Sequence, residues 1–191
     1  MSKIKKLTTC AVLIALSVVL VFVSKMIPAP WMQGGSITLA SMVPIIVISL
    51  VIDTKWGLLS GLAFSLIQMM TGFYPPPTQT FLNFALVVLL DYVLAFGLLG
   101  LAGSFYNLFG QKLWAIPVSG AIVTAFRYVC HILSGILIWG VYADEGQSVL
   151  SYSVLYNGSY MIPEIIITTI VLALLSKLIK KQRRQFHPNA N

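Results

Sequence analysis

Six long apolar runs dominate the sequence and are separated by short segments rich in proline, glycine and polar residues. They cover roughly residues 7–27, 36–52, 56–73, 79–103, 113–141 and 158–179. A helix needs about 20 apolar residues to cross a bilayer, so these runs predict six transmembrane helices. The strands of a membrane barrel would instead alternate in roughly ten-residue pieces. The sequence therefore predicts an all-α integral membrane protein.

Composition excludes the other broad classes of protein. Of the 191 residues, 58% are hydrophobic and 9% are charged, whereas an average soluble domain is about 45–50% apolar and about 25% charged. Intrinsic disorder needs low hydrophobicity and high charge. Six spans use nearly the whole length, so we expect a single transmembrane domain over residues 1–181 and a polar tail over 182–191.

The basic residues predict the orientation of the helices. Ten of the 12 Lys and Arg residues lie before the first run, at or beyond the end of the last run, or in the loops after the second and fourth runs. Because cytoplasmic loops carry an excess of positive charge, we expect both termini in the cytoplasm, which requires an even number of spans. The net charge of +7 then reports topology, and we expect the lipid bilayer and no nucleic acid as a partner.

Four acidic or basic residues stand inside the predicted spans, away from the span ends. A charged side chain there costs about 2.5–3.5 kcal/mol on insertion scales and usually faces a cavity or another polar group. Asp91 interrupts the fourth run, Arg127 and His131 share one face of the fifth, and Glu164 lies in the sixth. Trp139 continues the face of His131. The topology puts almost all of them at or above the midplane, which predicts a pocket that opens outward.

The charges in this region favour a cationic ligand. Asp91 and Glu164 contribute two negative charges and Arg127 one positive charge, so one negative charge is left over if His131 is neutral. A monovalent cation would cancel it, and nearby aromatic rings would hold a flat cation. Protonation of one carboxyl would also cancel it. Three more polar side chains are expected where the last outer loop enters the sixth span: Tyr152, Tyr156 and Asn157.

Each of these residues also has a structural interpretation. Arg127 has about even odds of a purely structural role, tied to Glu164 or to backbone carbonyls. Glu164 follows Pro163 near an expected helix start, where an acid complements the helix dipole, so a structural role is favoured. His131 alone is more often an interhelical hydrogen-bonding residue, and the aromatic residues are also typical of interfacial belts. Asp91 is harder to explain in this way, because its partner must be Arg127, a proton or a ligand.

Catalytic motifs are missing from the sequence. It has no G-x-x-x-x-G-K-[ST] loop, no Gly-x-Ser-x-Gly elbow and no histidine pair at i, i+4, and Cys130 with His131 makes too few ligands for zinc. We therefore expect neither enzyme activity nor a cofactor nor a metal site. A membrane enzyme or channel with Asp91, Arg127 and His131 as a proton relay stays as the alternative from another class.

Four stretches carry a family resemblance: QGGSITL (33–39), LLDYVLAFGLLGLAG (89–103), RYVCHILSG (127–135) and YSVLYNGSYMIPE (152–164). In order and spacing they resemble the thiamine-specific S-components of energy-coupling factor (ECF) vitamin importers. The resemblance covers nearly the whole chain. It implies a substrate-capturing subunit in a prokaryotic plasma membrane, working with a transmembrane coupling subunit and two ATPase subunits.

The resemblance also assigns roles to residues. The family's thiamine site uses an acid of the fourth span with its neighbour, a histidine and a tryptophan of the fifth, and a tyrosine and an asparagine near the sixth, which fall here on Asp91, Tyr92, His131, Trp139, Tyr152 and Asn157. Secondary lining positions are Trp31, Gln33, Gln68, Arg127, Tyr156 and Glu164. A small-xxx-small motif on the first span would contact the coupling subunit. Ala11 and Ala15 fit it, although such spacing is common in membrane helices.

One departure from the family keeps the cargo open. Family members can carry an acid and an aromatic ring around the first outer loop, whereas this chain has Trp31, Gln33, Gly34 and Ser36 there and no acid. The alternative is therefore the same fold and role with a different small vitamin or precursor, such as a pyridoxine-like compound or a thiamine fragment.

Overall fold

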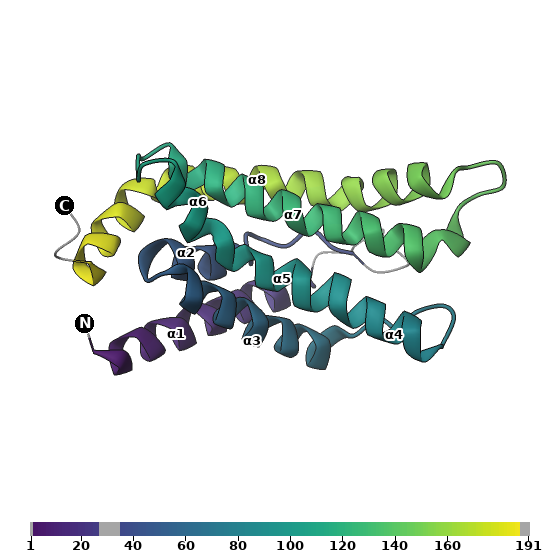
Figure 1. Ribbon diagram of the computed structural model, residues 1–191, viewed down its shortest axis with the longest axis horizontal. Coiled ribbons are helices and arrows are strands. Elements are labelled where there is room, and N and C mark those ends of the chain that lie inside the picture. Colours follow the sequence, from purple (N-terminus) through teal and green to yellow (C-terminus); the bar gives the residue numbers. More distant parts are fainter. Residues whose placement is uncertain (1, 27–34, 188–191) are drawn as a thin grey trace.

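The computed structural model describes residues 2–26 and 35–187, and in these ranges it contains helices and no strands. Within these ranges, six main helical segments follow one another (Figure 1), which confirms the predicted all-α fold. They are α1 (Lys3–Ser24), α2 (Val43–Val51), α3 (Thr54–Gly72), a composite rod over Phe81–Leu108, α7 (Ala115–Leu137) and α8 (Val149–Phe186).

The composite rod changes its helical type along its length. It consists of α4 (Phe81–Val87), the π-helix η1 (Val88–Leu94), α5 (Ala95–Gly97), the 3₁₀-helix η2 (Leu98–Leu101) and α6 (Ala102–Leu108). Turns of π-helix are rare in proteins, but those that occur are often found at functional sites. Here the π-helix carries Asp91 and Tyr92, so the irregular part of the rod holds the ionisable residue that the sequence singles out. A short 3₁₀-helix, η3 (Trp139–Tyr142), follows α7.

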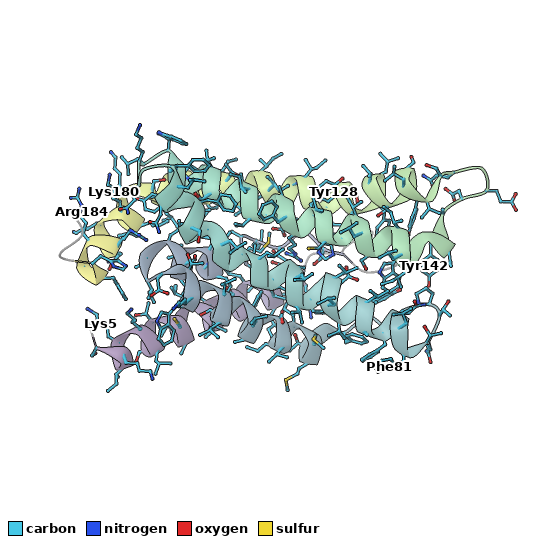
Figure 2. All side chains as sticks on the ribbon, in the orientation of Figure 1. Lys5, Phe81, Tyr128, Tyr142, Lys180 and Arg184 are labelled. Carbon is cyan, nitrogen blue, oxygen red and sulfur yellow. The ribbon has the colours of Figure 1, made fainter. Side chains whose placement is uncertain are left out.

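Both termini lie at the same end of the bundle (Figure 1). There Lys6 Nζ is 3.4 Å from Asp53 Oδ2, in the turn between α2 and α3, and Lys5 Nζ is 5.7 Å from the centre of the Phe186 ring. Figure 2 shows Lys180 and Arg184 at this end as well. An even number of crossings, as the charge pattern predicts, leaves the two termini on one side.

The second predicted span is wrong in its secondary structure. A continuous helix over 36–52 is expected, but only the nine residues Val43–Val51 are helical, and residues 36–42 are not. Nine residues of helix rise about 14 Å, less than half of a hydrocarbon core of about 30 Å. Every α2 residue except Val47 is buried, under α1, α3 and α8. Non-helical backbone at membrane depth is tolerated when protein covers it, and Thr38, Ser41 and Met42 of the non-helical segment are buried.

Four segments are long and apolar enough to cross a bilayer by themselves: Lys3–Ser24, Phe81–Leu108, Ala115–Leu137 and Val149–Phe186. The last of them differs from the expected span of 158–179, because α8 begins at Val149 and continues through Pro163 to Phe186. Glu164 therefore lies about four turns inside the helix, and its interpretation as an acid near a helix start is wrong. Residues 182–186 of the expected tail are helical.

Glycines hold the composite rod against α3. A Cβ added at Gly100 would lie 2.2 Å from the backbone nitrogen of Leu58, and one added at Gly61 would lie 2.5 Å from the carbonyl oxygen of Phe96. Small residues of this kind let membrane helices approach closely. The contact fixes the rod beside α3 a short distance along the chain from Asp91, so it also positions the irregular turn.

Gly100→Ala should destabilise the protein, because the new methyl group meets backbone that cannot move aside. Overpacking of this kind costs about 1–3 kcal/mol, which should appear as a clear fall in the melting temperature of the detergent-purified protein. Gly97→Ala is the matched control, since its Cβ meets only the flexible Leu62 side chain, at 3.3 Å. Equal melting temperatures for the two variants would contradict this account of the packing.

Candidate substrate-binding site

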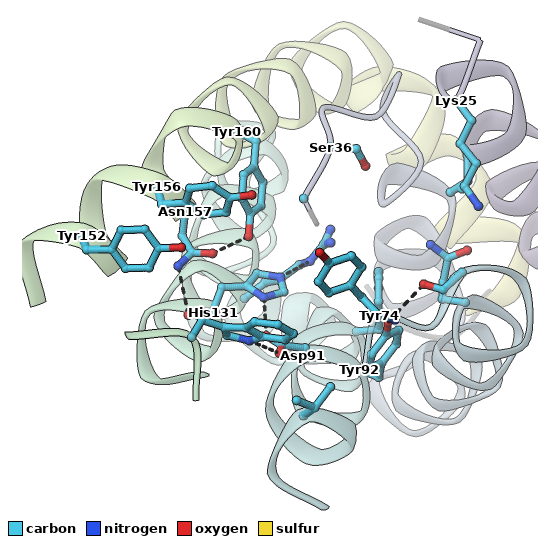
Figure 3. Close-up of a pocket in the computed structure, with 18 residues that line it drawn as sticks. Lys25, Ser36, Tyr74, Asp91, Tyr92, His131, Tyr152, Tyr156, Asn157 and Tyr160 are labelled. Carbon is cyan, nitrogen blue, oxygen red and sulfur yellow. Dashed lines mark hydrogen bonds and ion pairs between the residues drawn. The ribbon is translucent and has the colours of Figure 1, made fainter. Parts of the chain in front are cut away.

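A cavity of about 190 Å³ lies among the helix ends farthest from the termini. Figure 3 shows Tyr152, Tyr156 and Tyr160 of α8 on one side of it and Lys25 and Ser36 on the other. All six primary positions from the sequence line this cavity: Asp91, Tyr92, His131, Trp139, Tyr152 and Asn157. Of the secondary positions, Gln68, Arg127 and Tyr156 line it and Glu164 does not; Trp31 and Gln33 lie outside the described residues.

Three side chains donate hydrogen bonds to the Asp91 carboxylate in the cavity. Its Oδ1 is 2.8 Å from His131 Nδ1, and its Oδ2 accepts hydrogen bonds from Ser134 Oγ and, at 3.3 Å, from Trp139 Nε1. The partners of the carboxylate therefore come from α7 and η3. Arg127, which the sequence offers as one possible partner, is not among them. Ser134 lies three residues after His131, so helical spacing puts it on the same face, a signal that the sequence analysis missed.

Arg127 contacts the same network from one turn earlier in α7. Its Nε donates a hydrogen bond to His131 Nε2 at 3.2 Å, its Nη1 is 2.9 Å from the sulfur of Met42, and its guanidinium carbon lies 4.4 Å from the centre of the Phe96 ring. Among the described residues, no carboxylate oxygen lies within 4.0 Å of this guanidinium. The direct pair with Glu164, one of the structural options that the sequence leaves open for Arg127, is therefore not formed.

Helix α8 supplies an aromatic face and an amide. Tyr152, Tyr156 and Tyr160 follow one another at intervals of four residues, with ring centres 5.6 and 6.3 Å apart. Asn157 Nδ2 donates to the carbonyl oxygen of His131 at 3.2 Å, and its Oδ1 accepts from the Tyr160 hydroxyl. These residues lie on a helix and not in a loop entering it, which corrects the expected boundary. The four-residue interval is the signal that could have revealed Tyr160, which the sequence analysis missed.

Close packing of α7 against α8 makes these contacts possible. A Cβ added at Gly135 would lie 2.0 Å from Ser153 Oγ and 3.1 Å from Asn157 Nδ2. Ser153 Oγ in turn donates to the carbonyl oxygen of Ile132 at 2.8 Å. The glycine therefore lets the amide of α8 reach the backbone of α7 beside His131.

The third wall comes from the end of α3 and the loop after it. The Tyr92 hydroxyl donates to the carbonyl oxygen of Gly72 at 3.2 Å and accepts from the amide of Tyr74 at 3.1 Å, and the Tyr74 ring centre lies 5.4 Å from that of Trp139. The sequence analysis missed Tyr74, because it stands in a proline-rich loop without periodicity. The arrangement suits a flat cation, which needs a carboxylate and several ring faces. In the described part of the chain no three His, Cys, Asp or Glu side chains gather as metal ligands.

The family model described as "Thiamine transporter protein" matches residues 7–184. The chain belongs to the thiamine transporter family. It is 35% identical over 180 residues to the thiamine transporter ThiT of Bacillus subtilis, covering 89% of each chain, and 30% identical over 96 residues to ThiT of Lacticaseibacillus paracasei, covering 46% of this chain and 48% of that one.

A solved structure supports the fold. ThiT from Listeria monocytogenes superposes with a TM-score of 0.71 at 24% sequence identity, over 95% of this chain and 98% of that one. The family model and the Bacillus subtilis relative confirm, at the level of the family, the resemblance that the four sequence motifs carry. Together with the four apolar spans, membership of the thiamine transporter family makes this chain a multi-pass membrane protein.

Glu164 has a structural contact in this family member. Its side chain is buried, its Oε1 accepts the backbone N–H of Thr38, and its Oε2 has no hydrogen-bond partner in the described residues. The amide of Leu39 is held nearby by Ser24 Oγ at 2.7 Å. Glu164 thus satisfies the non-helical backbone that precedes α2.

Glu164→Leu should loosen the segment over residues 36–42, because it leaves the buried Thr38 N–H without an acceptor. Such a loss costs about 1–3 kcal/mol. Hydrogen–deuterium exchange should show faster exchange of the segment in this variant than in Glu164→Gln, which keeps a carbonyl oxygen. Unchanged protection in the leucine variant would mean that Glu164 does not hold the segment.

Proposed function

We propose that this chain binds thiamine at the outer side of a prokaryotic plasma membrane and delivers it inward as the S-component of an ATP-driven ECF importer. The observation that carries the proposal is a deep carboxylate, Asp91, beneath a cavity with aromatic walls, in a chain of the thiamine transporter family. Thiamine joins a flat aminopyrimidine to a flat, permanently cationic thiazolium. The cavity offers a counter-charge and ring faces to such a molecule.

The side chains around the cavity divide into two chemical groups. Asp91, His131, Tyr152 and Asn157 offer donors and acceptors that suit the aminopyrimidine, and the Trp139 indole offers a face on which a ring can stack. A buried polar site that matches the groups of a ligand rejects analogues that lack them. This set of residues therefore predicts selectivity as well as affinity.

The direction of uptake follows from the charge distribution. The basic residues gather at the end that holds both termini, and the cavity lies toward the other end (Figures 1 and 2). With the basic end in the cytoplasm, the cavity faces outward. The sequence has no phosphate-binding loop, so the energy for delivery comes from the two ATPase subunits through the coupling subunit.

Titration of the purified chain with thiamine tests the proposal. Trp139 stands in the cavity wall, so binding should quench the intrinsic fluorescence in a saturable way, and Trp139→Phe should lose most of the signal change. Absence of saturable binding would remove the thiamine claim. A thermal-shift panel with pyridoxine-like compounds and thiamine fragments decides between thiamine and the alternative cargo, because the true ligand gives the largest stabilisation at equal concentration.

Asp91→Asn should weaken thiamine binding roughly ten- to a hundredfold, since a hydrogen bond or ion pair to a charged group is worth about 1.5–3 kcal/mol. A neutral analogue in which an uncharged ring replaces the thiazolium should lose much less affinity. The measurement is the dissociation constant of each ligand for both proteins. Equal losses for the two ligands would argue against Asp91 as the counter-ion.

Ala11 and Ala15 lie exposed on one face of α1, away from the cavity, and we propose that they contact the coupling subunit. Replacing both with Leu should reduce co-purification with that subunit by blocking close helix approach, while thiamine affinity stays unchanged. Ala173→Leu, on the exposed face of α8, is the matched control. Co-purification that tolerates the double substitution would place the contact elsewhere.

A further inference from the structure

We propose that Arg127 is a positioning residue that fixes the tautomer of His131, so that the histidine stays neutral and donates its only ring proton to Asp91. This inference rests on the proposed function, because its purpose is to keep a negative charge available to a cationic substrate. Arg127 carries a positive charge beside a proposed cation site, so its presence there needs an explanation.

The direction of the hydrogen bonds gives the first step. A guanidinium has five N–H donors and no acceptor, so the contact of 3.2 Å from Arg127 Nε to His131 Nε2 requires a lone pair on the imidazole nitrogen. The proton of a neutral imidazole must then be on Nδ1. That atom is 2.8 Å from Asp91 Oδ1, an acceptor, so the chain runs from Arg127 through His131 to Asp91 in a single direction.

The second step is that Arg127 is held in place independently of His131. Its Nη1 is 2.9 Å from the Met42 sulfur, and its guanidinium carbon lies 4.4 Å from the centre of the Phe96 ring. Met42 directly precedes α2 and Phe96 belongs to α5, so two elements other than α7 fix the guanidinium. The position of the Arg127 donor therefore does not depend on whether His131 is protonated.

Charged and titratable groups from each neighbouring element complete the surroundings. Asp91 comes from η1, and Cys130 and Arg127 come from α7 itself. From α8, the Tyr160 ring centre lies 6.0 Å from that of His131, and Glu164 acts on Arg127 electrostatically. Asp91 is the group among these that favours an imidazolium, and the N–H of Arg127 opposes it.

The third step is the effect on the substrate. An imidazolium would form an ion pair with Asp91 at 2.8 Å and cancel the charge that a thiazolium needs. A neutral His131 leaves Asp91 with hydrogen bonds from three donors but with its negative charge intact. Arg127 thus favours cation binding by excluding a second positive charge that would lie directly against the carboxylate.

Nitrogen-15 NMR of the ligand-free protein tests the tautomer without reference to thiamine. The chain has two histidines, so a His187→Asn background leaves His131 as the single source of imidazole nitrogen signals. We expect one protonated nitrogen, Nδ1, and one unprotonated nitrogen, Nε2, between pH 7.5 and pH 5.5. Arg127→Met should convert the pair to two protonated nitrogens at pH 5.5, and Arg127→Lys should restore the original pattern. Arg183→Met, which removes an arginine near the C-terminal end of α8, should leave the protonation of both His131 nitrogens unchanged.

A pH profile of thiamine binding tests the consequence. The dissociation constant of the unchanged protein should vary less than twofold between pH 7.5 and pH 5.5, whereas that of Arg127→Met should rise tenfold or more at pH 5.5. A merely structural role would weaken binding equally at both pH values and would overturn the proposal. A proton on His131 Nε2 in the unchanged protein would also overturn the proposal. That spectrum is decisive even if Arg127→Met fails to fold.

Failure of thiamine binding alone would count against the proposed function, and the NMR result would still decide the tautomer.

Discussion

A carboxylate inside a membrane protein needs hydrogen-bond donors or a counter-charge. The donors that contact Asp91 organise this structure. Its oxygens accept hydrogen bonds from His131 and Ser134 on α7 and from Trp139 on η3, while the residue itself comes from the π-helical part of the composite rod. An isolated charge among lipid-embedded helices is costly, so these donors define how α7 approaches the rod. The cavity is the space left above this junction, and its charge and its aromatic walls follow from the same contacts.

The same constraint governs the irregular backbone. The segment over residues 36–42 is not helical, and α2 after it is too short to cross a bilayer. Helix α2 is buried by its neighbours, as are Thr38, Ser41 and Met42 of the segment before it, and Glu164 accepts a hydrogen bond from the backbone N–H of Thr38. Unpaired backbone groups are not tolerated in lipid, so a buried glutamate here has a structural task close to the cavity without lining it. Two carboxylates inside the bundle therefore have different partners, which supports different roles for them.

Arg127 lies beside the proposed cation site without pairing with its carboxylate. Its guanidinium lies against the Phe96 ring and the Met42 sulfur and donates to His131, so the imidazole stands between it and the Asp91 carboxylate. Charge counting from the sequence treats Asp91, Glu164 and Arg127 as a sum. Their positions matter more, because a hydrogen bond has a direction and Coulomb energy depends on distance.

Much of the site was accessible from the sequence because it depends on residue type and helical spacing. Arg127 and His131 lie four residues apart, so any helix puts them on one face, and an ionisable residue in an apolar run predicts a polar interior wherever it occurs. Tyr160 was within reach of the same argument, since it continues the interval of Tyr152 and Tyr156. Tyr74 was not, because a proline-rich loop has no period from which a direction can be inferred.

The sequence by itself determined the class of the protein, the number of helical segments and the residues that lipid would reject, since these follow from the transfer of side chains between water and hydrocarbon. Only the tertiary structure decided that the second segment is a short buried helix, that Glu164 holds backbone and that Asp91 pairs with His131 in place of Arg127. These outcomes depend on which helices come close enough for glycine contacts and hydrogen bonds between residues far apart in the chain. A local pattern of apolar and polar residues does not predict those distances.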